Sequence, residues 1–158
     1  MITINIGFTN NNPNFLIDSF KKMTITRLDL DWTAKKTLKM IRDRTMKGLD
    51  YTGAKFFRYS GSDTIPPTKY ALKRQKVGKT VDIVNLQWSG NMLNSMTVKS
   101  TDKEAQIYFA DATPRFIAYK HNTGKEGVPQ REFFGLTQQE CEFVFNAMLN
   151  RKARGGRL

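Results

Sequence analysis

The chain has 158 residues, of which 39% are apolar, enough for one domain built around one core. Its mean hydropathy is −0.51 and no stretch approaches the ~20 apolar residues of a membrane span, which argues against a membrane protein. The net charge of +12 at pH 7 implies a polyanionic partner or an acidic neighbouring protein surface, unless it is a solubilising excess.

The N-terminal third is predicted to hold one strand and two helices. Apolar residues alternate over residues 2–8, which predicts a strand and does not resemble a signal peptide, so we expect synthesis in a cytoplasm. A short helix is expected from Pro13 to Met23. The strongest helical pattern runs from Asp31 to Lys47, with Asp31 as its N-cap and Gly48 just beyond its end.

This long predicted helix has an apolar face and a basic face. The positions expected to face the core are Ala34, Leu38, Ile41 and Thr45. The basic positions, spaced i, i+4 and i+7, are Lys35, Lys39 and Arg42. The basic stripe is either a solvated helix face or a surface that contacts nucleic acid or an acidic partner.

Turn-forming residues dominate residues 50–68, where Pro66-Pro67 excludes a regular helix or a central strand. A short basic helix is expected to follow from Thr68 to Lys76 and to end at Gly78. Ser89 is a candidate cap for a short helical turn.

A β-hairpin is predicted after that turn. Its strands cover residues 96–99 and 105–110, and the polar residues 100–103 form the connection. A helix from Pro114 to His121 and a loop over residues 122–128 come next. Residues 131–134 are then expected to form a strand.

The last helix has a clear start, because Thr137 and Glu140 have the spacing of a capping box. It is expected to end near Asn150, so the domain spans residues 1–150 and the basic residues 151–158 form a mobile tail. The residues expected on its apolar face are Cys141, Val144, Phe145 and Met148.

Cys141 is the single cysteine, which excludes an internal disulfide and a cysteine-based metal site. Its position on the apolar face predicts a small buried side chain. Together, the elements predict an α+β fold in which a small, mostly antiparallel sheet packs against the long helix and the C-terminal helix.

We find no nucleotide-binding glycine loop, no HExxH, no zinc-ligand spacing and no GxSxG, so no catalytic residue, metal or cofactor is expected. His121 is the only imidazole. A structural or interfacial role is favoured over that of general base in a small nuclease, because Glu126 and Glu132 are merely sequence neighbours. Asp29 and Asp31 precede a helix, which favours capping over metal binding.

Five short blocks follow one another between residues 50 and 137. The first three are Asp50, Gly53 and Phe56; Tyr70-Ala71-x-Lys73 with Gly78; and Val81-Asp82-Ile83 before Ser89-Gly90-x-Met92-Leu93-x-Ser95. The last two are Ala118-x-x-His121 with Gly124, and Pro129-x-Arg131-Glu132-Phe133-Phe134-Gly135-Leu136-Thr137. In this order the blocks resemble the virion morphogenesis proteins of tailed bacteriophages, also called tail completion or neck proteins. Phe134, Thr137 and Ile117 stand where that family more often has Leu, Ser and Tyr.

The resemblance implies a non-catalytic virion component at the joint between head and tail, made in the host cytoplasm. It implies a ring of copies, six-fold in the family, between head-closure or connector proteins and tail terminator proteins. Non-specific contact with packaged DNA is also expected. From the residues alone, the alternative is a basic accessory protein that binds nucleic acid.

Two sets of candidate contact residues follow. The candidate assembly interface is Arg131, Glu132, Phe133, Phe134 and His121. In a strand, Phe133 and Phe134 point to opposite faces, so either one faces outward or both are core. The candidate contacts to DNA or to an acidic partner are Lys69, Lys73, Arg74, Lys76, Lys79, Arg151, Lys152, Arg154 and Arg157.

Overall fold

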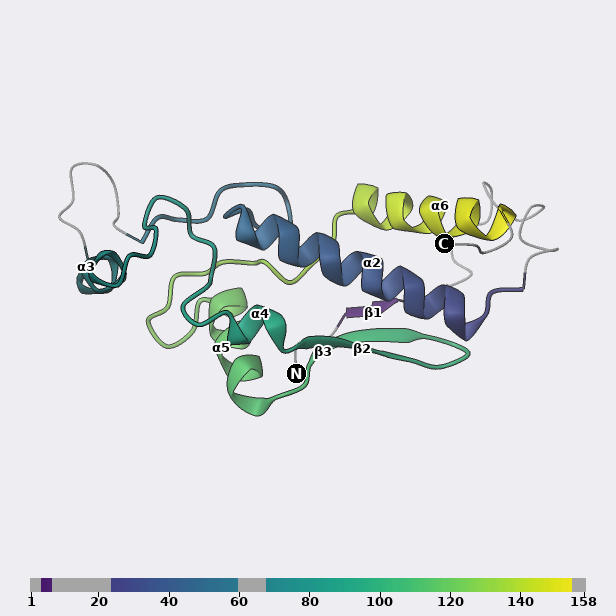
Figure 1. Cartoon of the computed structure of the whole chain (residues 1–158), viewed down its shortest axis with the longest axis horizontal. Coiled ribbons are helices and arrows are strands. Elements are labelled where there is room, and N and C mark those ends of the chain that lie inside the picture. Colours follow the sequence, from purple (N-terminus) through teal and green to yellow (C-terminus); the bar gives the residue numbers. More distant parts are fainter. Residues whose placement is uncertain (1–3, 7–23, 60–67, 155–158) are drawn as a thin grey trace.

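A computed structural model describes residues 24–59 and 68–154, together with the backbone of residues 4–6 (Figure 1). The elements are β1 (Ile4–Ile6), α2 (Arg27–Met46), α3 (Lys69–Lys76), α4 (Asn91–Asn94), β2 (Met96–Ser100), β3 (Ala105–Phe109), α5 (Ala112–Thr123) and α6 (Gln138–Ala153). The fold is α+β, as predicted. The helix predicted from Pro13 to Met23, the ends of the strand predicted over residues 2–8, and Pro66-Pro67 lie outside the described residues.

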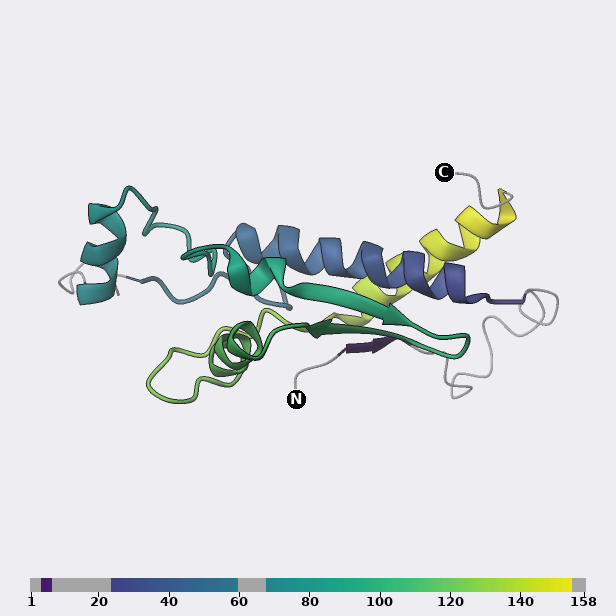
Figure 2. The ribbon, with the colours of Figure 1, turned by 60° about the horizontal axis from the view of Figure 1, so that its bottom comes forward.

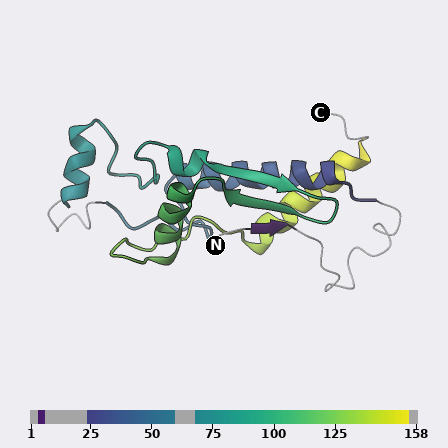
Figure 3. The ribbon, with the colours of Figure 1, turned by 90° about the horizontal axis from the view of Figure 1, so that it is seen from below.

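The sheet is antiparallel, with strand order β1-β3-β2 (Figure 3). The predicted hairpin is confirmed: Val98 of β2 lies opposite Ile107 of β3. Alternate residues of β3, namely Ala105, Ile107 and Phe109, are buried. One face of the hairpin therefore packs into the core, beneath α2, which runs along the body in Figure 2.

Helix α2 begins earlier than predicted, directly after Thr26. The Thr26 hydroxyl accepts the N–H of Asp29, and the Asp29 carboxylate accepts the N–H of Thr26 at 2.9 Å, which is a capping box. The prediction of Asp31 as N-cap is therefore wrong, because a reciprocal pair satisfies two N–H groups where a lone Asp satisfies one. Asp31 instead accepts a hydrogen bond from the Ser100 hydroxyl of β2 at 3.2 Å.

The C-terminal end of α2 is as predicted. Gly48 follows the C-cap Lys47 with a φ of +78°, which favours glycine, and a Cβ there would lie 3.0 Å from the side chain of Ile83. The buried face of the helix includes the predicted residues Ala34, Leu38, Ile41 and Thr45.

Helix α3 projects from one end of the molecule, away from the sheet (Figures 1 and 3). We call residues 56–59 and 68–88 the arm. As predicted, Thr68 caps α3, and Gly78 follows the last turn with a φ of +69°. Arg74 is 1% exposed; its Nε donates to the carbonyl of Thr80 at 2.9 Å and its Nη1 to the carbonyl of Gln87 at 3.0 Å. Arg74 thus holds the irregular return segment against α3.

The segment 129–136 is irregular, so the strand predicted over residues 131–134 is wrong. Its backbone groups are satisfied outside any β-ladder: the N–H of Arg131 donates to the carbonyl of His121, and the carbonyl of Glu132 accepts from the N–H of Tyr51. The N–H of Phe134 donates to the side chain of Asn122 at 3.0 Å. With these partners in place, no strand is needed to satisfy the segment.

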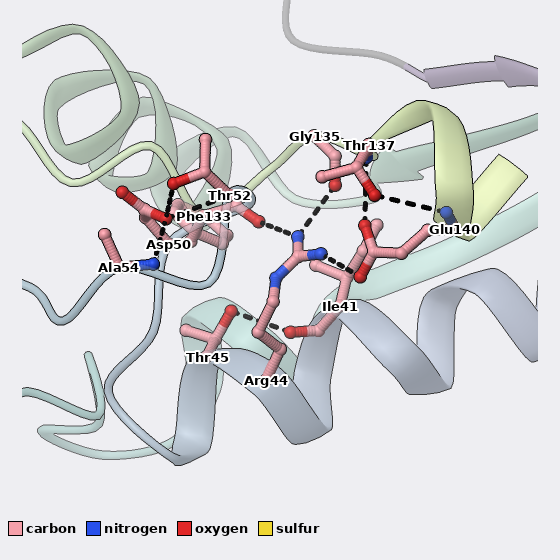
Figure 4. A network of polar contacts seen from close by, with 10 residues as sticks. All are labelled: Ile41, Arg44, Thr45, Asp50, Thr52, Ala54, Phe133, Gly135, Thr137 and Glu140. Atoms are coloured by element: carbon pink, nitrogen blue, oxygen red, sulfur yellow. Dashed lines mark hydrogen bonds and ion pairs between the residues drawn. The ribbon is translucent and has the colours of Figure 1, made fainter.

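Arg44, near the end of α2, completes this arrangement (Figure 4). Its guanidinium donates to the carbonyls of Phe133 at 3.1 Å and Gly135 at 2.7 Å, and it pairs with the carboxylate of Glu140. Glu140 also accepts the N–H of Thr137 at 3.0 Å, which confirms the predicted capping box of α6. One guanidinium therefore joins α2, the irregular segment and α6.

Two expectations for α6 are wrong. Cys141 is exposed, because the buried stripe of the helix passes through Val144 and Met148 instead. The helix also continues to Ala153 rather than ending near Asn150, so the basic C-terminal segment starts inside it. The extension has a partner, since Arg151 and Lys152 both form ion pairs with Asp29 at the start of α2.

We predict that Arg44→Met lowers the free energy of unfolding by about 3 kcal/mol, because it leaves the Glu140 carboxylate without its cation and two carbonyls without donors. Urea denaturation followed by circular dichroism measures this. The control is Lys39→Met, which removes an exposed pair with Asp43 and is expected to change the same free energy by less than about 0.5 kcal/mol. Equal losses in the two variants would contradict the role given to Arg44.

Candidate assembly surface

Three residues of the predicted assembly interface, namely Arg131, Phe133 and Phe134, are buried. Phe133 and Phe134 are 0% and 7% exposed, and their rings lie 6.3 and 5.3 Å from the ring of Phe109. Because the segment is not a strand, the two side chains do not point to opposite faces and both enter the core. Of the two alternatives for this pair, the structure therefore supports the one in which both side chains are core.

Arg131 also acts within the chain. It is 4% exposed, its Nη2 donates to the carbonyl of Phe57 at 3.4 Å, and its guanidinium lies 5.3 Å from the ring centre of Tyr59. Its place in the candidate assembly interface is not supported, because these partners lie within the chain. Glu132 is half-buried, and its carboxylate accepts a hydrogen bond from the side-chain amide of Gln130.

His121 lies beside Arg131, with 3.4 Å between its Nδ1 and Nη1 of the guanidinium. Burial, and secondarily the positive charge of Arg131, lowers the pKa of His121 to about 4, so the ring is neutral near pH 7. Within the described part of the chain, no group of three or more His, Cys, Asp or Glu residues is placed to hold a metal ion. The geometry assigns His121 to the packing of this corner.

Tyr59 lies between two cations. The guanidinium of Arg74 is 4.4 Å from its ring centre and that of Arg131 is 5.3 Å away. In the residues that the structure describes, neither guanidinium has a carboxylate within ion-pair distance. Cation–π contacts and carbonyl groups stabilise both charges in place of an anion. Tyr59 thus links the arm, through Arg74, to the body, through Arg131.

The predicted cationic contacts divide into engaged and exposed residues. Arg74 is buried, so the prediction that it meets DNA or a partner is wrong. Arg151 and Lys152 are half-buried and pair with Asp29, and their contact with DNA or a partner stays a prediction. Arg157 lies outside the described residues. The other predicted contacts are all exposed or half-exposed, namely Lys69, Lys73, Lys76, Lys79 and Arg154.

The basic stripe on α2 is largely engaged as well. Lys39 pairs with Asp43 at 2.7 Å and Lys35 pairs with Asp31 at 2.6 Å. Arg42 is half-buried, and its guanidinium donates to carbonyls at the end of α4 and the start of β2. Arg42 fits neither of the two interpretations given for the stripe, because its guanidinium connects α2 to the hairpin.

Sequence reasoning missed a concentration of exposed apolar side chains. Among the described residues, eight of eleven exposed large hydrophobic side chains lie on the arm or on α5, namely Phe57, Tyr70, Leu72, Val77, Ile83, Trp88, Phe116 and Ile117. The exposed apolar residues of the arm, together with the lysines of α3, form what we call the arm surface. Exposed apolar side chains with a polar surround are typical of an interaction site. The sequence did contain an indication of this surface, because most of these apolar residues lie between residues 57 and 88, a segment too rich in turns to build a core of its own.

Comparisons with protein-family models, with curated proteins and with solved structures find no match for this chain. In the described residues, no helix combines the length and the apolar character that crossing a membrane requires.

We predict that stability falls as the pH is lowered from 6.5 towards 4. The pKa of His121 is depressed in the folded protein, so in this window the unfolded chain binds a proton that the native chain does not. The loss should reach about 3 kcal/mol and level off below pH 4. Urea denaturation at a series of pH values measures it.

The control for this prediction is His121→Gln, which keeps an acceptor for Arg131 but does not titrate. Its stability should stay nearly level between pH 6.5 and 4. The capping carboxylate of Asp29 acts in a separate window. Burial raises its pKa, but hydrogen bonds from Lys152 and Thr26 outweigh this and lower it to about 2, so its contribution is lost only below its ordinary value of 3.8. A wild-type profile as level as that of the variant would contradict the assignment.

Proposed function

We propose that the protein is a structural, non-catalytic component of a tailed-bacteriophage virion that assembles at the neck and joins or stabilises head and tail. In this proposal several copies form a ring, six-fold by the resemblance, between the head-closure or connector proteins and the tail terminator proteins. The carrying observation is the ordered series of blocks between residues 50 and 137.

The blocks at the two ends of this series pack against each other. Asp50 closes its turn by accepting from the N–H groups of Thr52 and Ala54. The next residue, Tyr51, donates its N–H to the carbonyl of Glu132 at 2.8 Å. A Cβ on Gly135 would lie 3.0 Å from the Tyr51 ring, so the close approach favours glycine. The first and last blocks therefore depend on each other.

Several residues of the inner blocks also have structural roles. Gly90 begins α4 with a φ of +84°, and Ala118 is fully buried in α5. Gly124 ends α5 with a φ of +68°, and a Cβ there would meet the backbone and side chain of Gln130. These residues form a framework. Other residues of the same blocks, namely Tyr70, Lys73 and Ile83, are exposed on the arm, where partner contacts are proposed.

Charge supports the location at the neck. The chain carries +12, and the lysines of α3 are exposed, so a DNA channel or an acidic subunit surface is a favourable neighbour. The same charge opposes close approach of free copies. We therefore propose that the ring forms when the chain docks on a head or tail, rather than in solution.

The second candidate function is a basic accessory protein that binds nucleic acid. The observation in its favour is the exposure of Lys69, Lys73 and Lys76 on one short helix. Duplex DNA binding by the purified chain, with an affinity that falls steeply as salt is raised, would favour this candidate. Absence of the chain from purified virions would favour it further.

We predict that the double charge reversal Lys69→Glu with Lys76→Glu impairs the joining of heads to tails, because both lysines are exposed on the arm surface. Phage production from the variant gene should drop by about tenfold or more, with free heads and free tails visible by electron microscopy. The matched control is Lys99→Glu with Lys103→Glu on the hairpin, two exposed lysines away from the arm.

The outcome against the proposal is equally concrete. Normal yields of infectious particles from the arm variant, at a circular dichroism spectrum and melting temperature like the wild type, would remove the arm lysines from assembly. Virions that lack the chain and are built normally without it would remove the structural role itself.

A further inference from the structure

An open groove of about 620 Å³ lies where the arm meets α4 and α5. One wall comes from the arm and includes Tyr59, Tyr70 and Trp88. The opposite wall comes from α5 and includes Asp111 at its start and Ile117 in its middle. The volume lies in the range of ligand-binding clefts in proteins.

The arm wall is a continuous aromatic surface. The rings of Tyr59 and Tyr70 are 5.3 Å apart, and those of Tyr70 and Trp88 are 5.8 Å apart. Tyr70 is 44% exposed, Trp88 38%, and Ile117 on the facing wall 40%. These groups present apolar area to water on both sides of one groove, where covering it gains free energy.

The groove also presents hydrogen-bonding groups suited to a peptide main chain. Asn91 and Asn94 of α4 line it, and both are exposed. A primary amide offers two donors and an acceptor, which matches the alternating N–H and C=O groups of an extended chain. Aromatic walls beside amide groups are a combination used by sites that hold peptide segments.

Charge selects among peptides. The buried guanidiniums of Arg74 and Arg131 lie against the ring of Tyr59, and the ammonium of the exposed Lys73 lies 5.4 Å from the centre of the Trp88 ring. The one carboxylate that lines the groove is Asp111. The balance of nearby charge is positive, so a ligand that carries carboxylates is complementary.

The same residues disfavour nucleic acid. A nucleic-acid backbone carries a phosphate at every unit and needs cationic donors along its whole length, whereas no lysine or arginine side chain lines the groove itself. A peptide needs cations only at its carboxylates, which can lie at the cationic edge of the groove while its apolar side chains fill the interior. In solution, a second copy of the chain is disfavoured as the ligand too, because each copy carries +12.

We propose that this groove binds an extended segment of a partner protein in which aromatic or aliphatic side chains stand next to Asp or Glu. The apolar side chains pack on Tyr70, Trp88 and Ile117, and the asparagine amides bind the main chain. The carboxylates face the positive charge around Tyr59. This binding is a property of the purified chain and holds or fails separately from the neck role.

The test is fluorescence polarisation with the purified full chain and labelled synthetic peptides in which Phe or Leu alternates with Asp or Glu. We expect binding that weakens about tenfold in Trp88→Ala, which removes most of one wall. The matched control is Phe143→Ala, an aromatic side chain 58% exposed on α6, which should bind as the wild type does. Asp111→Asn should bind about threefold more tightly, because a like charge is removed from the groove.

Three results would overturn the proposal. The first is tighter binding of matched peptides in which Lys replaces Asp and Glu. The second is binding of a short single-stranded oligonucleotide that depends on Trp88, which would assign the groove to nucleic acid. The third is no binding of any acidic peptide by the folded wild-type chain. If Trp88→Ala disturbs the fold, Ile117→Glu on the facing wall takes its place and is expected to weaken binding similarly.

Discussion

The structure depends on the guanidinium of Arg44. The segment 129–136 has no strand neighbour, so two of its carbonyls rely on this one side chain. The same group neutralises Glu140, whose carboxylate caps the helix that follows. The end of α2, the turn into the core phenylalanines and the start of α6 are therefore fixed by a single charged contact. A charged side chain can hold an irregular segment in this way because it offers several donors in a planar fork.

A second pair of arginines governs the arm. Arg74 and Arg131 contact the ring of Tyr59 from the arm and from the body. Among the helices and strands that the structure describes, none packs against α3 to an extent comparable with the elements of the body. The position of the arm thus rests on these cation–π contacts and carbonyl groups together with its buried apolar side chains, which belong to the core and include Phe56, Val84 and Leu86. This explains how a short helix rich in lysine remains attached while most of its side chains stay in water.

Local signals in the sequence predicted local structure well. The hairpin, the capped helix α3 and the start of α6 each follow from neighbouring residues and are confirmed. Errors arose where a distant partner decides the outcome. The sequence predicted a strand over residues 131–134, but the backbone of this segment bonds to His121, Arg44 and Tyr51 instead of to a neighbouring strand. For the candidate site, charge alone did not separate the engaged cations Arg74, Arg151 and Lys152 from the exposed lysines of α3, and the aromatic groove gave no periodic pattern.

The difference between the buried and the exposed side chains of the arm has a consequence for the evolution of such a sequence. The body is constrained on all sides, since its glycines, capping pairs and core rings are each fixed by neighbours. The arm is constrained at its buried residues, which include Tyr59, Arg74 and Leu86, whereas its exposed side chains are not held in the core. Substitutions there are thus tolerated by the fold while they alter what the arm meets. Substitutions among the exposed residues of the arm therefore allow one partner to be exchanged for another while the framework stays unchanged.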